Sequence, residues 1–346
     1  MMPNPVMNVA SVVAPGELGL TKAVIPSPGP NEVLVRVDRV GICGSDLHLL
    51  PIAPQGGVIG HEFVGTVSAL GANVSKLVVG DRVCSMPCIS CGRCQHCLSG
   101  NPIQCEQVRY HGSGEEAGMG GFGEYVLAGG AECIKLPERI SISTAALIEP
   151  IAVGLHLFER AKVGVDEHLV ILGAGPIGLT VVLWARSMGV TKILVSDPVA
   201  ARRDIALAMG ATAVVDPIEE DLAEACQSIW DCLPEVIIEC MGRAGRFDIA
   251  TSTIRRGGRV VIGGMMFESE TIDSMTPFMK NISVEYVIQY EMKHFYHTVN
   301  MLEQGRIDPT PMISAEISLN ELPAMMQTLL KPNELCKVLV APGTIK

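Results

Sequence analysis

The feature that most constrains the fold is a glycine-rich turn between two apolar runs. The strand-like run His168–Leu172 is followed by Gly173, Ala174, Gly175, Pro176, Ile177 and Gly178. A helix-like apolar pattern then continues to Met188. Glycines at this spacing permit a tight turn and close packing of helix on strand. Pro176 stands near the first helical position, where its missing N–H is not needed. The segment predicts a strand–turn–helix unit of a parallel sheet.

Short apolar runs continue to alternate with helical patterns up to about residue 263. Strand-like runs fall at 192–196, 213–215, 236–239 and 258–263. Helical patterns lie near 200–209 and 219–230. Alternation at this spacing is typical of a doubly wound parallel sheet. The sequence therefore predicts a Rossmann α/β domain built around the turn.

The flanking regions have a different pattern. Residues 32–40 alternate apolar and polar side chains, and Gly and Pro interrupt further short strands, which predicts an irregular antiparallel, barrel-like β domain. We assign the last strand-like run, 337–340, to the same domain. A chain of 346 residues exceeds what a single core usually supports. We expect a β domain of residues 1–151 with 296–346, and an inserted α/β domain of residues 152–295.

An acidic residue stands where a dinucleotide-binding turn requires one. Asp197 follows the run 192–196, 19 residues after Gly178, where a carboxylate accepts hydrogen bonds from the adenosine ribose. Its charge would repel a 2′-phosphate, which favours NAD over NADP. Arg202 and Arg203 weaken that preference, although Arg202 can lie over the adenine. The alternative interpretation is an ordinary tight turn with a helix-capping Asp.

Four closely spaced cysteines indicate a structural zinc site. They lie in a lobe of about residues 84–110 without apolar periodicity, at Cys91, Cys94, Cys97 and Cys105. Four thiolates close a tetrahedron around zinc and leave no vacancy. Free thiols, disulfides and a nucleic-acid-binding zinc ribbon are the alternatives. Lys and Arg are sparse around the lobe, which argues against the ribbon.

A thiolate, an imidazole and a carboxylate form a second donor set. His61 and Glu62 follow Cys43 within twenty residues. A zinc ion with three protein ligands keeps one position open for a substrate. A buried thiol and a core histidine are the structural alternatives for Cys43 and His61.

Composition and charge limit the partners. Lys and Arg number 26 against 37 Asp and Glu, a net charge of −11. With no basic run, the sequence argues against nucleic acid and anionic membrane surfaces. No apolar run reaches the about 18 residues of a membrane-spanning helix. Twelve cysteines without a signal-peptide pattern indicate reduced thiols and metal ligands. We expect a cytoplasmic protein that acts on a small molecule.

Together the motifs resemble the zinc-dependent medium-chain dehydrogenase/reductase family, which includes alcohol, polyol and butanediol dehydrogenases. The resemblance covers essentially the whole chain. It implies a GroES-like irregular β-barrel catalytic domain plus a Rossmann domain, two zinc ions, NAD, and a homodimer or homotetramer. It also implies that Cys43 and His61 bind the catalytic zinc. Relatives differ in the third ligand, and this chain has Glu149 before a proline, as polyol and butanediol dehydrogenases do. We expect Glu62 to bind directly with Glu149 facing the metal; a solvated residue is the alternative for Glu149.

The resemblance further implies a proton path. Ser45 passes the alcohol proton through the ribose to His48, and Asp46 bonds the free nitrogen of His61. Zinc acidifies the alcohol before hydride transfer to NAD. The expected reaction interconverts a secondary alcohol, diol or polyol and its ketone. A solvent-facing residue is the alternative for His48. A catalytically silent dinucleotide-binding relative is the alternative for the whole chain.

The segment between Cys43 and His61 bears on the substrate. This segment, residues 49–57, is short and apolar. In relatives the corresponding segment helps to line the substrate pocket. A wall of Leu, Ile and Pro indicates a pocket that tolerates apolar substrates. Further candidates for its lining are Met119, Phe122, Met265 and Met266, for each of which core packing is the alternative.

Overall fold

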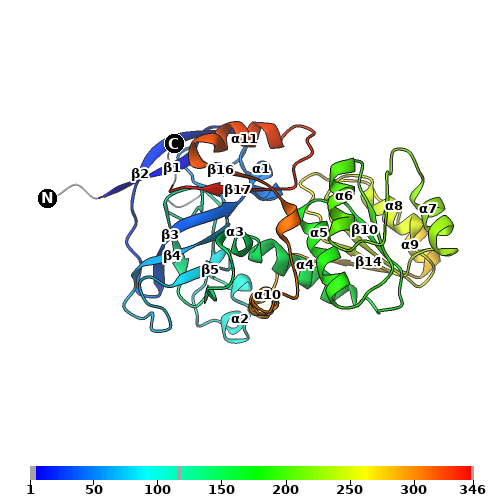
Figure 1. The fold of residues 1–346 in the computed structure, drawn as a ribbon, viewed down its shortest axis with the longest axis horizontal. Coiled ribbons are helices and arrows are strands. Elements are labelled where there is room, and N and C mark those ends of the chain that lie inside the picture. Colours follow the sequence, from blue (N-terminus) through cyan, green and yellow to red (C-terminus); the bar gives the residue numbers. More distant parts are fainter. Residues whose placement is uncertain (1–4, 115–117, 344–346) are drawn as a thin grey trace. The chain divides into compact units, whose positions relative to one another are not determined.

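The computed structural model describes residues 5–114 and 118–343 (Figure 1). The chain divides into two compact units. One, the β unit, comprises Met1–Glu149, Tyr290–Gln304 and Ile313–Lys346. The other, the α/β unit, comprises Pro150–Gln289 and Gly305–Met312. The two predicted zinc-ligand sets therefore lie in the β unit, and the glycine-rich turn lies in the α/β unit.

A seven-stranded sheet organises the β unit. Its strands run in the order β16-β17-β3-β4-β5-β9, and β8 pairs with β3. Strand β17 comes from the end of the chain and lies antiparallel to β3, with Leu339 opposite Gly41. The bounds are β3 Glu32–Gly41, β4 Glu62–Leu70, β5 Arg82–Ser85, β8 Tyr125–Gly129, β9 Cys133–Lys135, β16 Ile313–Ser318 and β17 Lys337–Ala341.

The core of the β unit follows from the period-two pattern of β3. Val33, Val35 and Val37 are buried on one face of the sheet. An N-terminal hairpin of β1 (Val6–Ala14) and β2 (Glu17–Val24) packs residues into the same core. The other strands and α-helices of this unit are α1 Gly44–Leu49, β6 Cys88–Ile89, α2 Gln95–Leu98, β7 Arg109–Tyr110, α3 Ile142–Ala145, α10 Met292–Glu303 and α11 Leu322–Leu329.

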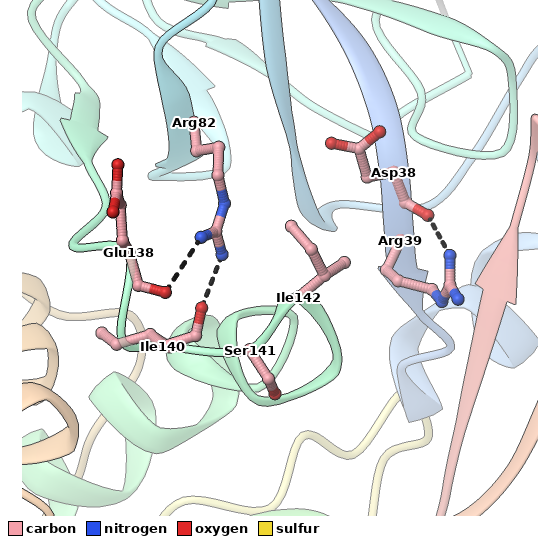
Figure 2. A pocket seen from close by; sticks show the side chains of 7 residues that line it. All are labelled: Asp38, Arg39, Arg82, Glu138, Ile140, Ser141 and Ile142. Carbon is pink, nitrogen blue, oxygen red and sulfur yellow. Dashed lines mark hydrogen bonds between the residues drawn. The ribbon is translucent and has the colours of Figure 1, made fainter.

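A surface cavity of about 540 Å³ lies beside β3 and β5, and its arginines are already engaged (Figure 2). Arg82 donates to the backbone carbonyls of Glu138 and Ile140. Arg39 donates to the carbonyl of Asp38 and to the Glu316 carboxylate. The Arg82 bonds fasten the segment after β9 to β5, and the bond from Arg39 to Glu316 joins β3 to β16. We therefore assign both arginines a structural role.

The α/β unit is built on a six-stranded parallel sheet. Its order is β12-β11-β10-β13-β14-β15, with every neighbouring pair parallel. The strands are β10 Leu169–Leu172, β11 Ile193–Ser196, β12 Ala213–Val215, β13 Val236–Glu239, β14 Arg259–Ile262 and β15 Ser283–Tyr286. The helices are α4 Ile148–Ala161, which starts in the β unit, α5 Pro176–Ser187, α6 Ala200–Ala208, α7 Leu222–Trp230, α8 Arg246–Thr253 and α9 Met275–Lys280.

The order of the strands fixes where a ligand can bind. From β10 the chain proceeds outward to β11 and β12, and then resumes on the other side of β10 with β13. In open α/β sheets ligands bind at such a reversal, outside the carboxyl ends of the strands. The glycine-rich turn leaves the carboxyl end of β10 and therefore lies at this point. The predicted doubly wound parallel sheet is confirmed. The sheet of the β unit is mixed: its pairs are antiparallel as predicted, except for the parallel pair β16–β17. The hairpin β1–β2 was not predicted.

Within the two described ranges, no helix combines the length and apolar character needed to cross a membrane.

Candidate active site

Helix α1 carries the first site residues, and its N-terminus is organised by Asp46. Cys43 is the N-cap, and its backbone N–H donates to Asp46 Oδ2 at 2.9 Å in a capping box. Asp46 is fully buried and also accepts from Gly60 N at 3.2 Å. Its Oδ1 lies 3.6 Å from His61 Nδ1. One carboxylate thus joins the segment that carries Cys43 to the segment that carries His61.

Three donor side chains converge beside this carboxylate. Ligand atoms of Cys43, His61 and Glu62 all lie within 4.8 Å of one another. Glu62 begins β4 opposite Gly41 of β3. A Cβ at residue 41 would overlap Glu62 Oε2, so glycine leaves room for the carboxylate. Thiolate, imidazole and carboxylate are the donor types that zinc takes in proteins.

Electrostatics favour a cation at this point. Burial opposes protonation of His61, but Asp46 and the Cys43 thiol outweigh it and raise the pKa of His61 well above its ordinary value. A site that holds a proton so firmly also attracts a metal ion, which must displace that proton to bind the imidazole. The donor set therefore fits zinc in chemistry as well as in spacing.

A buried lysine neutralises the carboxylate of the set. Lys337 Nζ donates to both oxygens of Glu62, at 2.7 and 2.6 Å, and to the carbonyl of Ile42 at 3.0 Å. Burial favours the neutral amine, yet the charge of Glu62 outweighs it and raises the pKa of Lys337. Sequence analysis missed this residue. Its only signal is a charged side chain that opens the apolar run of β17.

Glu149 lies outside the group of three donors. It is buried and accepts a short hydrogen bond from Tyr290 Oη. Burial raises the pKa of Glu149 to about 7. The charge of Glu62 adds to this rise in pKa, whereas the charge of His61 and the hydrogen bond from Tyr290 oppose it. Tyr290 is itself buried and was also missed by sequence analysis. A carboxyl group that titrates near neutrality beside the donor set can hold or release a proton there.

Ser45 and His48 both lie on α1, three residues apart, which places them on one side of the helix. Ser45 is half-buried and His48 is exposed. This arrangement is compatible with a path from the site to solvent. The relay itself stays a prediction.

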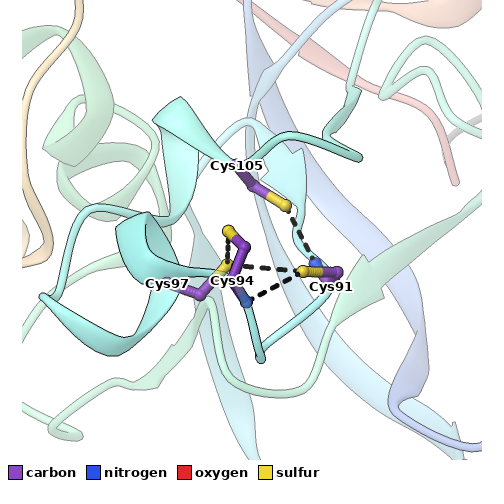
Figure 3. A group of neighbouring side chains, drawn as sticks. All are labelled: Cys91, Cys94, Cys97 and Cys105. Atoms are coloured by element: carbon purple, nitrogen blue, oxygen red, sulfur yellow. Dashed lines mark hydrogen bonds between the residues drawn. The ribbon is translucent and has the colours of Figure 1, made fainter.

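The four cysteines of the lobe converge on one point (Figure 3). Their sulfurs lie within 4.8 Å of one another, and backbone N–H groups point at them, as in Cys91 N to Cys105 Sγ at 3.2 Å. Hydrogen bonds from the backbone of Cys97 and Glu106 lower the pKa of Cys94 to about 6. Burial raises the pKa of Cys105 to about 11. Four sulfurs gathered in this way fit a closed zinc site.

The glycine-rich turn forms an open cradle. Gly175 caps α5, Pro176 is its first residue, and a Cβ on Gly175 would meet nothing within 4 Å. A Cβ on Gly178, in contrast, would overlap the carbonyl oxygen of Gly173, so the helix packs directly on the turn. The open space at Gly175 and the N-terminus of α5 fit a pyrophosphate.

Asp197 is buried at the carboxyl end of β11 and steadies the turn. Its Oδ2 accepts from Ala174 N at 2.8 Å and its Oδ1 accepts from Val199 N at 2.9 Å. A carboxylate offers about four acceptor positions, so positions remain for ribose hydroxyls. Arg202 follows in the first turn of α6.

Known proteins resemble the chain along its length. Residues 29–138 match the model of the alcohol dehydrogenase GroES-like domain and residues 176–304 that of the zinc-binding dehydrogenase family. Sorbitol dehydrogenase of Bacillus subtilis is 31% identical, over 94% of this chain and 95% of that protein. L-idonate 5-dehydrogenase of Vitis vinifera is 31% identical, over 86% and 84%. The chain belongs to the zinc-dependent medium-chain dehydrogenase/reductase family.

Solved structures agree with this assignment. A zinc-binding dehydrogenase of Sinorhizobium meliloti bound to NADP has a TM-score of 0.88 at 32% identity, covering 98% of this chain and 100% of that one. The 2R,3R-butanediol dehydrogenase of Bacillus subtilis has a TM-score of 0.85 at 27% identity, covering 97% and 100%. The predicted family, fold class and oxidoreductase class are confirmed. Zinc and a nicotinamide dinucleotide are the family's typical cofactors, and its substrates are small molecules.

The α/β unit of this dehydrogenase has a cavity of about 350 Å³ on the side of the switch point away from Asp197. Loops after β13, β14 and β15 line it, and Met265 and Met266 are among the lining residues. The other two candidates for the pocket lining, Met119 and Phe122, are core residues. Met119 packs with Leu34 and Leu127, and Phe122 belongs to the main core of the β unit.

Proposed function

We propose that this dehydrogenase interconverts a secondary alcohol, diol or polyol and its ketone, with NAD as the hydride acceptor. The observation that carries the proposal is the convergence of Cys43, His61 and Glu62 on one point of the β unit. The same chain also has, in its α/β unit, the glycine-rich turn held by Asp197. The names of the sorbitol and butanediol dehydrogenases among its relatives support this substrate class. The short apolar segment 49–57 supports tolerance of less polar members of that class.

Each residue has a proposed role in the chemistry. When bound, zinc supplies Lewis-acid polarisation of the substrate hydroxyl, and the nicotinamide accepts the hydride. Cys43 and His61 would hold the metal, and Asp46 would fix the orientation of the His61 ring. Ser45 would pass the proton of the alcohol through the ribose to His48, which would release it to solvent.

For the third ligand we propose Glu62, with Glu149 facing the metal. Glu62 belongs to the donor group, which supports the choice. Lys337 holds both its oxygens, so Lys337 and the metal would share the carboxylate. Glu149, hydrogen-bonded to Tyr290, remains the second carboxylate that faces the site.

We propose a structural zinc at Cys91, Cys94, Cys97 and Cys105, and a reducing, cytoplasmic setting that keeps these thiolates available. We also propose a homodimer or homotetramer. Strand β15 is one of the two edge strands of the parallel sheet. Tyr286 ends β15 and Ile288 follows it, and they are 70% and 62% exposed; Phe278, on the preceding helix α9, is 78% exposed. Exposed apolar side chains at a sheet edge favour pairing with a second chain. Light scattering would distinguish two chains from four.

Metal analysis of matched variants tests the two zinc sites. The parent protein should contain two zinc ions per chain. Both Cys43→Ser and Cys97→Ser should lower the content to one, but only Cys43→Ser should do so without lowering stability. A parent content near one that Cys43→Ser leaves unchanged would overturn the catalytic-zinc proposal.

Activity assays test the reaction. A panel of diols, polyols and hydrophobic secondary alcohols, followed by NADH absorbance with NAD and NADP in parallel, should reveal turnover. His61→Ala should abolish it and leave NADH binding intact. Dinucleotide binding and two zinc ions without turnover of any alcohol would instead identify a catalytically silent relative.

A further inference from the structure

In the sequence, Arg202 and Arg203 weaken the preference for NAD that Asp197 indicates. The structure shows what holds the guanidinium of Arg203. Arg203 lies on α6 with its guanidinium beside the carboxyl end of β11. Its Nη1 donates to the carbonyl oxygen of Asp197 at 2.7 Å and to Asp216 Oδ2 at 2.8 Å. The guanidinium of Arg203 is therefore hydrogen-bonded to the backbone of Asp197, the residue that we expect to bind the ribose.

Asp216 is oriented by its own turn. It follows β12, the neighbour of β11 in the sheet, so the carboxyl ends of the two strands bring it next to Asp197. Its Oδ1 accepts from Ile218 N at 3.0 Å, which leaves Oδ2 directed at Arg203. The side chains of Arg203 and Asp216 are only 18% and 23% exposed, so water screens this ion pair incompletely.

We propose that Asp216 determines cofactor specificity by holding Arg203 away from a 2′-phosphate. The inference rests on the proposed NAD-dependent function. The negative charge of Asp216 cancels that of the Arg203 guanidinium, so this pair offers a 2′-phosphate no net positive charge. Arginine is otherwise well suited to bind phosphate, because its planar group presents several N–H donors. Asp216 neutralises that group and fixes its direction, so Asp197 remains the group that meets the ribose.

Asp216→Asn tests the proposal with minimal change. The amide oxygen can still accept from Ile218 N, but the amide nitrogen cannot accept from Arg203. The affinity for NADPH relative to NADH, measured by fluorescence titration, should rise about tenfold, the size of one charge-assisted hydrogen bond. The affinity for NADH itself should stay within about twofold. Competition by 2′,5′-ADP and 5′-AMP should show the same shift without the nicotinamide. Asp216→Ser, whose hydroxyl can also accept from Ile218 N, is the second variant should Asp216→Asn not fold.

Two controls separate release of Arg203 from a general change in charge. Glu220 lies on the same turn, where its N–H donates to the carbonyl of Asp216 at 3.0 Å, so Glu220→Gln removes the same charge without removing the acceptor. It should leave the NADPH:NADH ratio unchanged. The double variant Asp216→Asn with Arg203→Met should return the ratio to the parent value.

The outcomes are distinct. An unchanged ratio in Asp216→Asn, an equal shift in Glu220→Gln, or a shift that survives Arg203→Met would each overturn the proposal. Because the readout is binding, it does not depend on turnover. A protein that shows the expected shift but oxidises no alcohol would refute the proposed function and leave this inference standing.

Discussion

At the scale of single residues, the buried pair of Lys337 and Glu62 shapes the site most strongly. Both side chains are about 1% exposed or less, so each charge depends on the other. Such a pair adds little net stability, whereas loss of one partner leaves a buried, uncompensated charge. Substitution of either Lys337 or Glu62 alone should therefore destabilise the protein.

We predict that Lys337→Met lowers the free energy of unfolding by about 3–5 kcal/mol. Urea denaturation of the metal-free protein measures the effect. The double variant Glu62→Gln with Lys337→Met should recover most of the loss, because it removes both charges. If the double variant is as unstable as Lys337→Met alone, packing of the lysine stem and not the ion pair is responsible.

The same residues show where sequence analysis reaches its limit. Cys43, His61 and Glu62 stand in recognisable local motifs and could be predicted together. Lys337 could not, because its partner is 275 residues away and a single lysine in an apolar run has no periodic signal. Tyr290 was missed for the same reason, since 141 residues separate it from Glu149. Ion pairs and hydrogen bonds between distant segments appear only when the chain is folded.

At the scale of elements, two glycines of the glycine-rich turn have different roles: Gly178 is needed for packing and Gly175 for ligand binding. Gly178→Ala should cost about 1–3 kcal/mol of stability, because its Cβ would overlap a backbone oxygen. Gly175→Ala should stay within about 1 kcal/mol of the parent, because nothing occupies the space around it. It should nevertheless weaken NADH binding, since the methyl group fills the cradle.

Thermal unfolding and NADH titration on both variants check this pair. A Gly175→Ala protein that binds NADH as well as the parent would show that the pyrophosphate does not approach this residue. The elements themselves could be predicted because each carries its own periodicity. The strand expected at 168–172 is β10, Leu169–Leu172, and the helix expected to reach Met188 ends at Ser187. The hairpin β1–β2 was not predicted, because no strand was expected in residues 6–24.

At the scale of the whole molecule, stability should depend on pH through His111. This residue is 4% exposed, and its Nε2 lies 2.7 Å from the carbonyl of Leu127. Burial lowers the pKa of His111 to about 4, against 6.5 for an ordinary histidine. Because the folded pKa is depressed, its contribution is fully present above pH 6.5 and is lost as the pH falls from there towards 4.

We predict a loss of about 2 kcal/mol between about pH 7.5 and about pH 5 from this group alone. Urea denaturation of the parent and of His111→Gln measures it, since glutamine can keep a donor towards Leu127 and does not titrate. The parent curve should fall more steeply over this range. Parallel curves would show that His111 is not the group responsible.

The pairing of β17 with β3 has a consequence for how the protein forms during synthesis. All six strands of the parallel sheet lie between residues 169 and 286 and leave the ribosome as one uninterrupted stretch. The β sheet, in contrast, also needs residues 337–341, which are made after all of these strands. Contacts between distant segments form slowly because a long loop must close. We therefore expect the nucleotide-binding fold to be complete before the donor set has its counter-charge, so that metal loading follows translation.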